Sequence, residues 1–325
     1  MKKPYVYISS CHEKGGIHRF GWGPDGLLTP VDVTPLDRPM YTIIEGDRLY
    51  AVLRAPFADN EHSGVLSFQI EKDGSLTHPS DPVSTNGLVG CHLCIKNGRV
   101  YVTNYTSGSV AGLPDLLVTH GGSSVHPTRQ TSAHTHFVTP TPDGRYLLVT
   151  DLGMDRIFTY DHDLSLVDMA DAPVGNGPRH LAFSQDGALC YCVNELASSV
   201  SVYRYTDGAL EHLADYPALP DDFKGENTAA AIRCINGHVY VSNRGHDSIT
   251  CFKIVGEGLE RCGSFSCEGK SPRDFIVTGD RLICTNEQDN SVTVFEMRDN
   301  LPHKLIQKLT VEKALCVTVK EANDV

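Results

Sequence analysis

Polar residues with catalytic potential lie at the ends of apolar segments in the second half of the sequence. In the stretch GPRHLAFSQDGALCYCVNELASSVSVYRY, Arg179 and His180 open one apolar segment and Glu195 closes the next. A histidine or a carboxylate can act as a general base, and a guanidinium can stabilise an oxyanion or bind an anionic group. These residues form one site only if the fold brings the start of one segment beside the end of the next.

The elements that could do so belong to a repeat that runs along the chain. The pattern around Tyr191 and Asn194 recurs as VYVTNYTSGSV from Val100, YLLVTDLGMDRI from Tyr146, VYVSNRGHDSI from Val239 and LICTNEQDNSV from Leu282, and two further copies, from Val6 and Leu49, are more divergent. The anchor residues of the seven copies are Tyr7, Tyr50, Tyr101, Leu148, Tyr191, Tyr240 and Ile283, with gaps of 43, 51, 47, 43, 49 and 43 residues. A four-stranded propeller blade takes about 40–50 residues. We therefore predict an all-β fold, a seven-bladed β-propeller that forms a single domain over residues 1–325.

Each copy divides into four antiparallel strands at its own turn residues. Asp-Gly and Asn-Gly steps, the usual hairpin signal, follow the first strand at Asn97, Asp143, Asp186 and Asn236. The chain opens with a segment of the second-strand type, PYVYISS, and the segment from Lys313, KALCVTVK, has the first-strand pattern. We expect this C-terminal strand to join the N-terminal blade and close the ring, which removes an exposed sheet edge.

Ring closure would gather the unusual residues at one end of the central channel. The start of the first strand and the end of the second lie at the same end of an antiparallel blade, and the first strand is nearest the channel. The residues predicted to be equivalent to Arg179 are Met40, Cys91, His136, Ala229 and Arg273. The residues predicted to be equivalent to Glu195 are Tyr105, Leu152, Arg244 and Glu287. One mouth of the channel should therefore be strongly polar.

Several of these residues also have simpler explanations. Arginine and glutamate at strand ends often form surface ion pairs worth under about 1 kcal/mol, and Arg179 and Glu195 could pair in this way. His134 and His136 share a strand face and could hold a metal, but no third ligand has matching spacing, so no metal is predicted. The string CHLC, which begins at Cys91, resembles a redox motif but lies in a strand and is predicted to be core.

The composition argues against several classes of function. A formal net charge of −12 disfavours binding to nucleic acid or to an anionic membrane, and an anionic small substrate would need locally placed arginines. The serines have no Gly-x-Ser-x-Gly context, which disfavours a serine hydrolase. The first apolar run is too short for a signal peptide or a membrane span, and the eleven cysteines are odd in number and fit reduced thiols. We expect a cytoplasmic protein.

The repeats that contain these residues resemble a known family. The strings GPRHLAFSQDGALCYCVNELASSVSVY, THFVTPTPDGRYLLVTDLGMDRIFTY, YVSNRGHDSITCF and SPRDFIVTGDRLICTNEQDNSVTVF are similar to the lactonase family of seven-bladed propellers, over residues 130–298. That family includes propeller-type 6-phosphogluconolactonases and carboxy-cis,cis-muconate cyclases. The resemblance implies opening or closing of a lactone ring without metal or organic cofactor. It also implies a catalytic cluster of His136, Arg179, Glu195 and Arg244.

Lactone hydrolysis suits these residue types. It needs a deprotonated water, a stabilised oxyanion and a protonated alcohol leaving group. Either Glu195 or His136 is the expected base, and Arg179 is the expected oxyanion stabiliser. Arg244 and Arg273 would bind a substrate phosphate or carboxylate. The remaining predicted substrate-binding residues are His180 and Glu287.

Three functions fit the sequence. The leading prediction is hydrolysis of 6-phospho-glucono-1,5-lactone, a small anionic sugar lactone. The alternatives are a lactonizing or delactonizing enzyme for another carboxylate, and a non-catalytic propeller that binds a ligand or a protein. A binding scaffold would present aromatic and apolar residues at the mouth, where this chain has Arg, His and Glu. A Gly/Ser/His-rich segment before His134, in the third blade, could form a lid that alters substrate choice.

Overall fold

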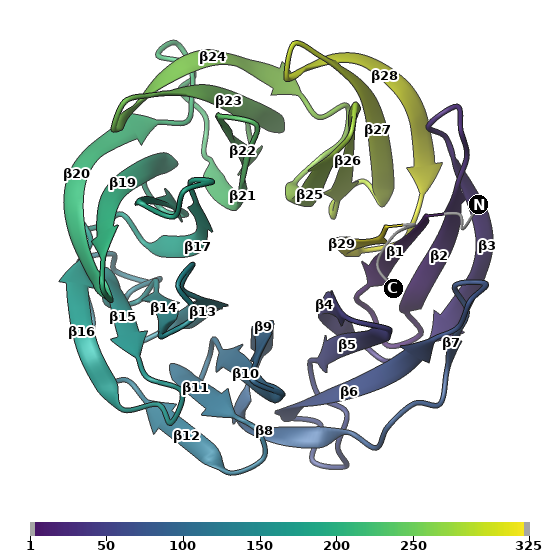
Figure 1. The fold of residues 1–325 in the computed structure, drawn as a ribbon, viewed down its shortest axis with the longest axis horizontal. Helices are drawn as coiled ribbons and strands as arrows, with labels where there is room; N and C mark the ends of the chain where they lie inside the picture. Colours follow the sequence, from purple (N-terminus) through teal and green to yellow (C-terminus); the bar gives the residue numbers. More distant parts are fainter. Residues whose placement is uncertain (1–3, 322–325) are drawn as a thin grey trace.

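The computed structural model describes residues 4–321, in which β-strands form seven sheets around a central axis (Figure 1). The sheets succeed one another along the chain as the blades of a seven-bladed β-propeller, as predicted. Neighbouring strands within each sheet are antiparallel. Within the described residues, no helix has the length and hydropathy needed to cross a membrane.

The first blades contain the following strands, given from the axis outwards. The first sheet consists of β29 (Ala314–Lys320), β1 (Tyr5–Ser10), β2 (Gly16–Trp22) and β3 (Leu28–Pro35). The second consists of β4 (Pro39–Glu45), β5 (Arg48–Leu53), β6 (His62–Ile70), β7 (Leu76–Thr77) and β8 (Val83–Leu88). The third consists of β9 (Gly90–Lys96), β10 (Arg99–Asn104), β11 (Ser109–Gly112) and β12 (Leu116–Thr119).

The remaining four blades are more regular. The fourth consists of β13 (Thr135–Pro140), β14 (Leu147–Asp151), β15 (Arg156–Tyr160) and β16 (Leu166–Asp171). The fifth consists of β17 (Pro178–Phe183), β18 (Leu189–Asn194), β19 (Ser199–Thr206) and β20 (Ala209–Pro217). The sixth consists of β21 (Thr228–Ile235), β22 (His238–Arg244), β23 (Ser248–Val255) and β24 (Gly258–Ser266). The seventh consists of β25 (Pro272–Thr278), β26 (Arg281–Asn286), β27 (Ser291–Arg298) and β28 (Leu301–Thr310).

The second blade has a divided outer strand. Both β7 and β8 pair with β6, one at each end of it. Pro79 and Pro82 lie in the connecting segment, and proline has no N–H to continue a ladder of hydrogen bonds. In the third blade, β11 and β12 have only four residues each, which accounts for the weak strand pattern of that part of the sequence.

The ring is closed as the sequence predicts. The C-terminal β29 pairs with β1 and occupies the innermost position of the first sheet, near the axis (Figure 1). Side chains reinforce this closure, since Ser10 Oγ donates to the carbonyl of Glu312 at 2.5 Å and Ser9 Oγ accepts from the backbone N–H of Cys316 at 3.1 Å.

A buried asparagine ends the second strand of most blades and holds the following turn. In four blades its Nδ2 donates to a serine Oγ five residues later, in the pairs Asn104 with Ser109, Asn194 with Ser199, Asn243 with Ser248 and Asn286 with Ser291. All four asparagines are fully buried. These pairs explain why the repeat is so clear at this turn, and they fix the residue that follows each asparagine.

The hydrophobic core lies between the faces of neighbouring blades. One cluster combines residues of the fifth and sixth blades, such as Val200 and Ile232, and another combines residues of the sixth and seventh, such as Ile249 and Phe275. Anchor tyrosines of the repeat also link the blades. Tyr101 Oη donates to the carbonyl of His162, in the β15–β16 turn of the next blade, at 2.6 Å.

Candidate active site

In five blades the inner strand has a β-bulge near the mouth of the channel. In the fifth blade Pro178 pairs with Asn194 and His180 pairs with Val193, so Arg179 is the extra residue. The same irregularity occurs in four other blades, at Met40, Cys91, His136 and Arg273. A bulge bends the strand and changes the direction of a side chain. The sequence alignment therefore identified four of the five residues equivalent to Arg179 correctly.

The sixth blade departs from the alignment by one residue. Ala229 pairs with Asn243 just as Pro178 pairs with Asn194, so the residue equivalent to Arg179 is Ala230, and the prediction of Ala229 was wrong. Three consecutive alanines give no internal signal for the register. Their small side chains leave space for the guanidinium of Arg179, whose Nη1 donates to the carbonyl of Ala230 at 2.6 Å.

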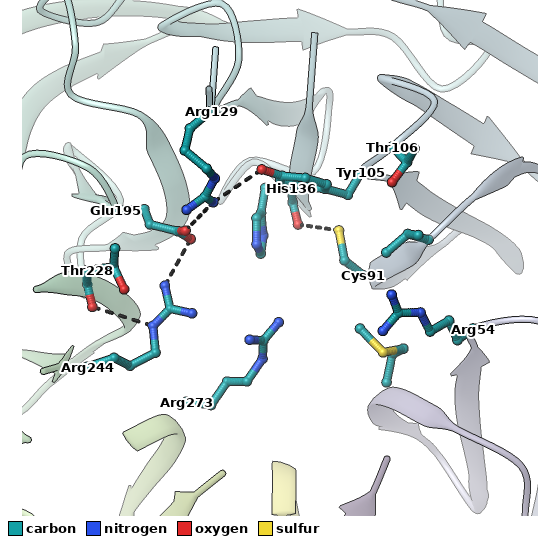
Figure 2. Close-up of a pocket in the computed structure, with 12 residues that line it drawn as sticks. Arg54, Cys91, Tyr105, Thr106, Arg129, His136, Glu195, Thr228, Arg244 and Arg273 are labelled. Carbon is teal, nitrogen blue, oxygen red and sulfur yellow. Dashed lines mark hydrogen bonds and ion pairs between the residues drawn. The ribbon is translucent and has the colours of Figure 1, made fainter. Parts of the chain in front are cut away.

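The residue at or just after the end of each second strand lies at the same end of its blade. These residues are Cys11, Arg54, Tyr105, Leu152, Glu195, Arg244 and Glu287. Four of them, Arg54, Tyr105, Glu195 and Arg244, line a cavity of about 400 Å³ together with four of the bulged residues (Figure 2). Its lining consists of Met40, Arg54, Val89, Cys91, Tyr105, Thr106, Arg129, His136, Glu195, Thr228, Arg244 and Arg273. A cavity of this size is typical of sites for small molecules.

Glu195 is the centre of a buried charge cluster. Its Oε2 accepts from Arg179 Nε at 2.8 Å and lies 3.1 Å from Arg244 Nη2, while its Oε1 accepts from Arg129 Nη2 at 2.5 Å. The side chain is only 4% exposed. Figure 2 shows Arg129 and Arg244 approaching the carboxylate from different sides. Three guanidiniums therefore share one carboxylate.

This environment makes Glu195 a weak base. Burial alone would raise the pKa of Glu195, but the charges of Arg244, Arg179 and Arg129 outweigh burial and hold it well below its ordinary value. A carboxylate with a strongly lowered pKa accepts a proton poorly at neutral pH. The group is suited to holding arginines in place and to stabilising positive charge nearby.

Arg179 lies beneath the cavity and does not line it. Its side chain is 3% exposed, and Nη1 also donates to Nε2 of His180 at 3.1 Å. Burial, followed by the charge of Arg244, lowers the pKa of Arg179 to about 9, so the group is charged at pH 7. With its donors committed to Glu195, Ala230 and His180, Arg179 is placed to orient Glu195.

His136 lines the cavity and is neutral at pH 7. Burial, followed by the charge of Arg179, lowers its pKa well below 6.5. Nδ1 of His136 is buried and has no hydrogen-bond partner among residues 4–321. The ring lies edge-on to Tyr105, at 5.7 Å between centroids, and 5.3 Å from His180. The uncharged imidazole keeps a lone pair that can accept a proton, although its lowered pKa makes it a weaker base than an exposed histidine.

His180 belongs to an aromatic layer below the cavity. In four blades the residue following the bulge contributes to this layer: Tyr41, His92, Phe137 and His180 contact one another with centroid distances of 4.0 to 6.4 Å. His180 is 3% exposed and is not part of the cavity lining. The predicted substrate-binding residue is thus separated from the cavity by Arg179 and His136.

Arg273 and Glu287 form a weaker pair at the rim. Arg273 Nη1 lies 3.3 Å from Glu287 Oε2, and both side chains are partly exposed. Arg273 lines the cavity, whereas Glu287 lines an adjoining cavity of about 760 Å³ that also contacts Arg129 and Arg244. The structure therefore places His136, Glu195, Arg244 and Arg273 around one space, with Glu287 next to it.

Two arginines of the cavity were missed in the sequence. Arg54 follows β5 just as Glu195 follows β18, and extending the alignment to the divergent copy LYAVLRAPF would have found it. Arg129 comes from the segment between β12 and β13, which was predicted only as a lid, and no repeat position marks it. Gln130, fully buried, anchors this segment by donating to the carbonyl of Leu152 at 2.9 Å.

The cysteines and histidines form no recognisable metal or redox centre in the part of the chain described. No group of three or more His, Cys, Asp or Glu side chains is placed to hold a metal ion within residues 4–321. His134 makes a separate contact, because its Nδ1 lies 2.9 Å from the carbonyl oxygen of Tyr105. Cys94 packs in the core as predicted, but Cys91 also lines the cavity, where burial raises its thiol pKa to about 11.

Comparisons with known proteins agree with this architecture. The family model described as "Lactonase, 7-bladed beta-propeller" matches residues 5–319. An uncharacterized protein of Staphylococcus epidermidis is 33% identical, over 96% of this chain and 98% of its own. Two solved structures are each 26% identical and cover 98% of this chain. The periplasmic gluconolactonase of Pseudomonas aeruginosa has a TM-score of 0.89 and is covered over 99% of its length. A Bacteroides fragilis protein described as a "putative 6-phosphogluconolactonase" has a TM-score of 0.88 and is covered over 98%.

Proposed function

The chain belongs to the lactonase family of seven-bladed β-propellers, and from this membership we propose that it hydrolyses 6-phospho-glucono-1,5-lactone to 6-phosphogluconate, as in the pentose phosphate pathway. One observation carries the proposal beyond the family. The cavity is lined by four arginines, a neutral histidine and a single glutamate, in a protein of net charge −12. Such a local excess of positive charge favours an anionic substrate.

His136 is the proposed general base. It is neutral at pH 7 and lines the cavity, so it can take a proton from a water that attacks the lactone carbonyl carbon. Glu195 attracts the imidazolium that forms, because its negative charge favours protonation of His136. The carboxylate itself is too strongly held by arginines to serve as the base.

Arg244 is the proposed oxyanion stabiliser. It lines the cavity and is fixed by Glu195 and by the carbonyl of Ala229, to which Nη2 donates at 3.0 Å. A preorganised cation beside the carbonyl stabilises the negative charge of the tetrahedral intermediate. Collapse of the intermediate breaks the bond to the ring oxygen, and His136 returns its proton to that oxygen. Arg179 acts through Glu195 as a positioning residue.

Known relatives support this assignment. The Pseudomonas aeruginosa relative is named a gluconolactonase, and the Bacteroides fragilis relative is described as a "putative 6-phosphogluconolactonase". Both share the fold of this chain over nearly its full length. The positive charge of the cavity favours the phosphorylated lactone over the uncharged one.

The test is hydrolysis of freshly prepared 6-phospho-glucono-1,5-lactone, corrected for spontaneous opening, by the purified protein and by His136→Gln. We expect the wild type to accelerate hydrolysis and the variant to lose at least about 100-fold in kcat, the usual contribution of a general base. The wild-type rate should fall with an apparent pKa below 6.5, because protonated His136 cannot accept a proton. Rates equal to spontaneous opening for the wild type, or an unchanged acid limb in the variant, would contradict the proposal.

A further inference from the structure

Arg54 is an arginine of the cavity without a carboxylate partner. It is the first residue after β5 and its guanidinium points into the cavity (Figure 2). Its backbone groups are used, since the carbonyl accepts from Ser63 Oγ and the N–H donates to the carbonyl of Arg38. Within residues 4–321, its guanidinium has no hydrogen bond or ion pair. Its side-chain charge is therefore available to a ligand.

The other arginines that line the cavity are committed to protein carboxylates to different degrees. Arg129 and Arg244 both contact Glu195, at 2.5 Å and 3.1 Å. Arg273 has a longer contact, 3.3 Å, with Glu287. Four arginines and one glutamate give the lining a net charge of +3, and counting Glu287 reduces it to +2. Of these four arginines, Arg54 has no carboxylate contact among the described residues, and the contact of Arg273 is the longest of the other three.

Arg54 and Arg273 come from the second and seventh blades, but both line the same cavity and both place positive charge near Cys11. Cys11, between these blades, is influenced by both charges, which oppose the rise of its thiol pKa caused by burial. Figure 2 shows both guanidiniums directed at the open space, with Arg273 between Arg54 and Arg244. The space between them and His136 is the cavity itself.

We infer that Arg54, together with Arg273, forms the phosphate subsite, and that the lactone carbonyl binds on the side away from Arg54, next to His136 and Arg244. This inference rests on the proposed function. A phosphate monoester carries a charge of about −1.5 to −2 at pH 7, which matches the net charge of the lining. Guanidiniums suit phosphate oxygens because of their paired donors. The substrate class is thus a lactone that carries a phosphate remote from its carbonyl.

The experiment compares Arg54→Gln and Arg54→Lys with the wild type on 6-phospho-glucono-1,5-lactone and on glucono-1,5-lactone. We expect Arg54→Gln to raise KM for the phosphorylated lactone by about 10- to 100-fold, the usual effect of losing a charged hydrogen bond, with little change in kcat. Kinetics with the unphosphorylated lactone should stay within about 2-fold, and Arg54→Lys should recover part of the loss. Arg156→Gln, on the outer part of the fourth blade and paired with Asp171, is the matched control and should leave all values unchanged.

Direct binding of 6-phosphogluconate, measured by calorimetry, separates the two proposals. If the wild type opens neither lactone but Arg54→Gln weakens 6-phosphogluconate binding at least 10-fold, the phosphate subsite stands and the proposed function fails. If the wild type is active but Arg54→Gln affects both lactones equally or neither, the subsite is overturned and the function stands. A wild type that prefers the unphosphorylated lactone also overturns the subsite.

Discussion

Glu195 shows how one buried carboxylate can organise a whole site. It accepts from Arg179 below, Arg244 at one side and Arg129 above, and each of these arginines comes from a different segment of the chain. Removing the charge of a buried, shared carboxylate leaves its partners uncompensated. The residue therefore contributes both to stability and to the arrangement of the cavity.

Replacing Glu195 by Gln tests whether its buried ion pairs contribute more to stability than ordinary surface ion pairs do. We expect Glu195→Gln to lower the free energy of unfolding by about 3–5 kcal/mol, as when one partner of a buried ion pair is removed, and to reduce kcat/KM. Glu287→Gln is the matched control, because the Arg273–Glu287 pair is partly exposed and such pairs contribute about 0–1 kcal/mol. Urea unfolding of both variants measures the difference. Equal losses in the two variants would refute this account of Glu195.

Sequence alone could identify the residues that sit at repeat positions. His136, Arg179, Glu195, Arg244 and Arg273 all follow from the alignment because the bulge and the buried asparagine recur from blade to blade. The alignment could not show that the guanidinium of Arg179 turns downward, since this depends on the alanines of the next blade. Arg129 could not be found at all, because its position is determined by the packing of a loop and not by a periodic pattern.

At the level of the strands, hydroxyl groups of the anchor tyrosines form hydrogen bonds that connect neighbouring blades. Tyr7, Tyr101 and Tyr240 each donate to a carbonyl in an outer turn of the following blade, namely that of Gly74, His162 or Asn300, at 2.6 to 2.8 Å. Tyr191 occupies the same repeat position, yet its buried hydroxyl has no partner among the described residues. The sequence pattern makes these tyrosines look equivalent, whereas the contacts of their hydroxyls differ.

This difference gives a matched pair of substitutions. Tyr101→Phe and Tyr240→Phe should each lower the free energy of unfolding by about 1–2 kcal/mol, because a hydrogen bond is lost and a carbonyl is left without its partner. Tyr191→Phe should leave stability unchanged within about 0.5 kcal/mol or raise it, because a buried polar group without a partner is removed. Denaturant unfolding measures all three. A loss in Tyr191→Phe as large as in the other two would show that its hydroxyl is satisfied in solution.

At the scale of the whole molecule, three buried histidines from the inner strands of successive blades are neutral in the folded protein. Burial, helped by nearby arginines, holds the pKa values of His92, His136 and His180 well below 6.5. Unfolding would return each to about 6.5. Because the unfolded chain then binds more protons, stability is fully present above pH 6.5 and is lost as the pH falls below it.

We therefore expect the free energy of unfolding to fall by up to about 4 kcal/mol per pH unit below pH 6, about 1.4 for each of the three histidines. His92→Phe should reduce this slope by about one third, since Phe137 already occupies the equivalent place in the next blade. The exposed His303, replaced by Gln, should leave the slope unchanged. Urea titrations between pH 7.5 and 5.5 test this window, which lies above the range in which Glu195 and other carboxylates with lowered pKa values would be protonated. A flat profile over that range would mean that these histidines are not kept neutral by the fold.

The pairing of β29 with β1 also has a consequence for biosynthesis. Ser10 bonds to Glu312, 302 positions later, so the blade made first on the ribosome is the last to be completed. Until residues 314–320 emerge, the inner edge of β1 lacks its partner, and an unpaired strand edge can template association with other chains. The nascent propeller is therefore most vulnerable to aggregation before translation reaches β29, and factors that shield strand edges during synthesis should act on the first blade.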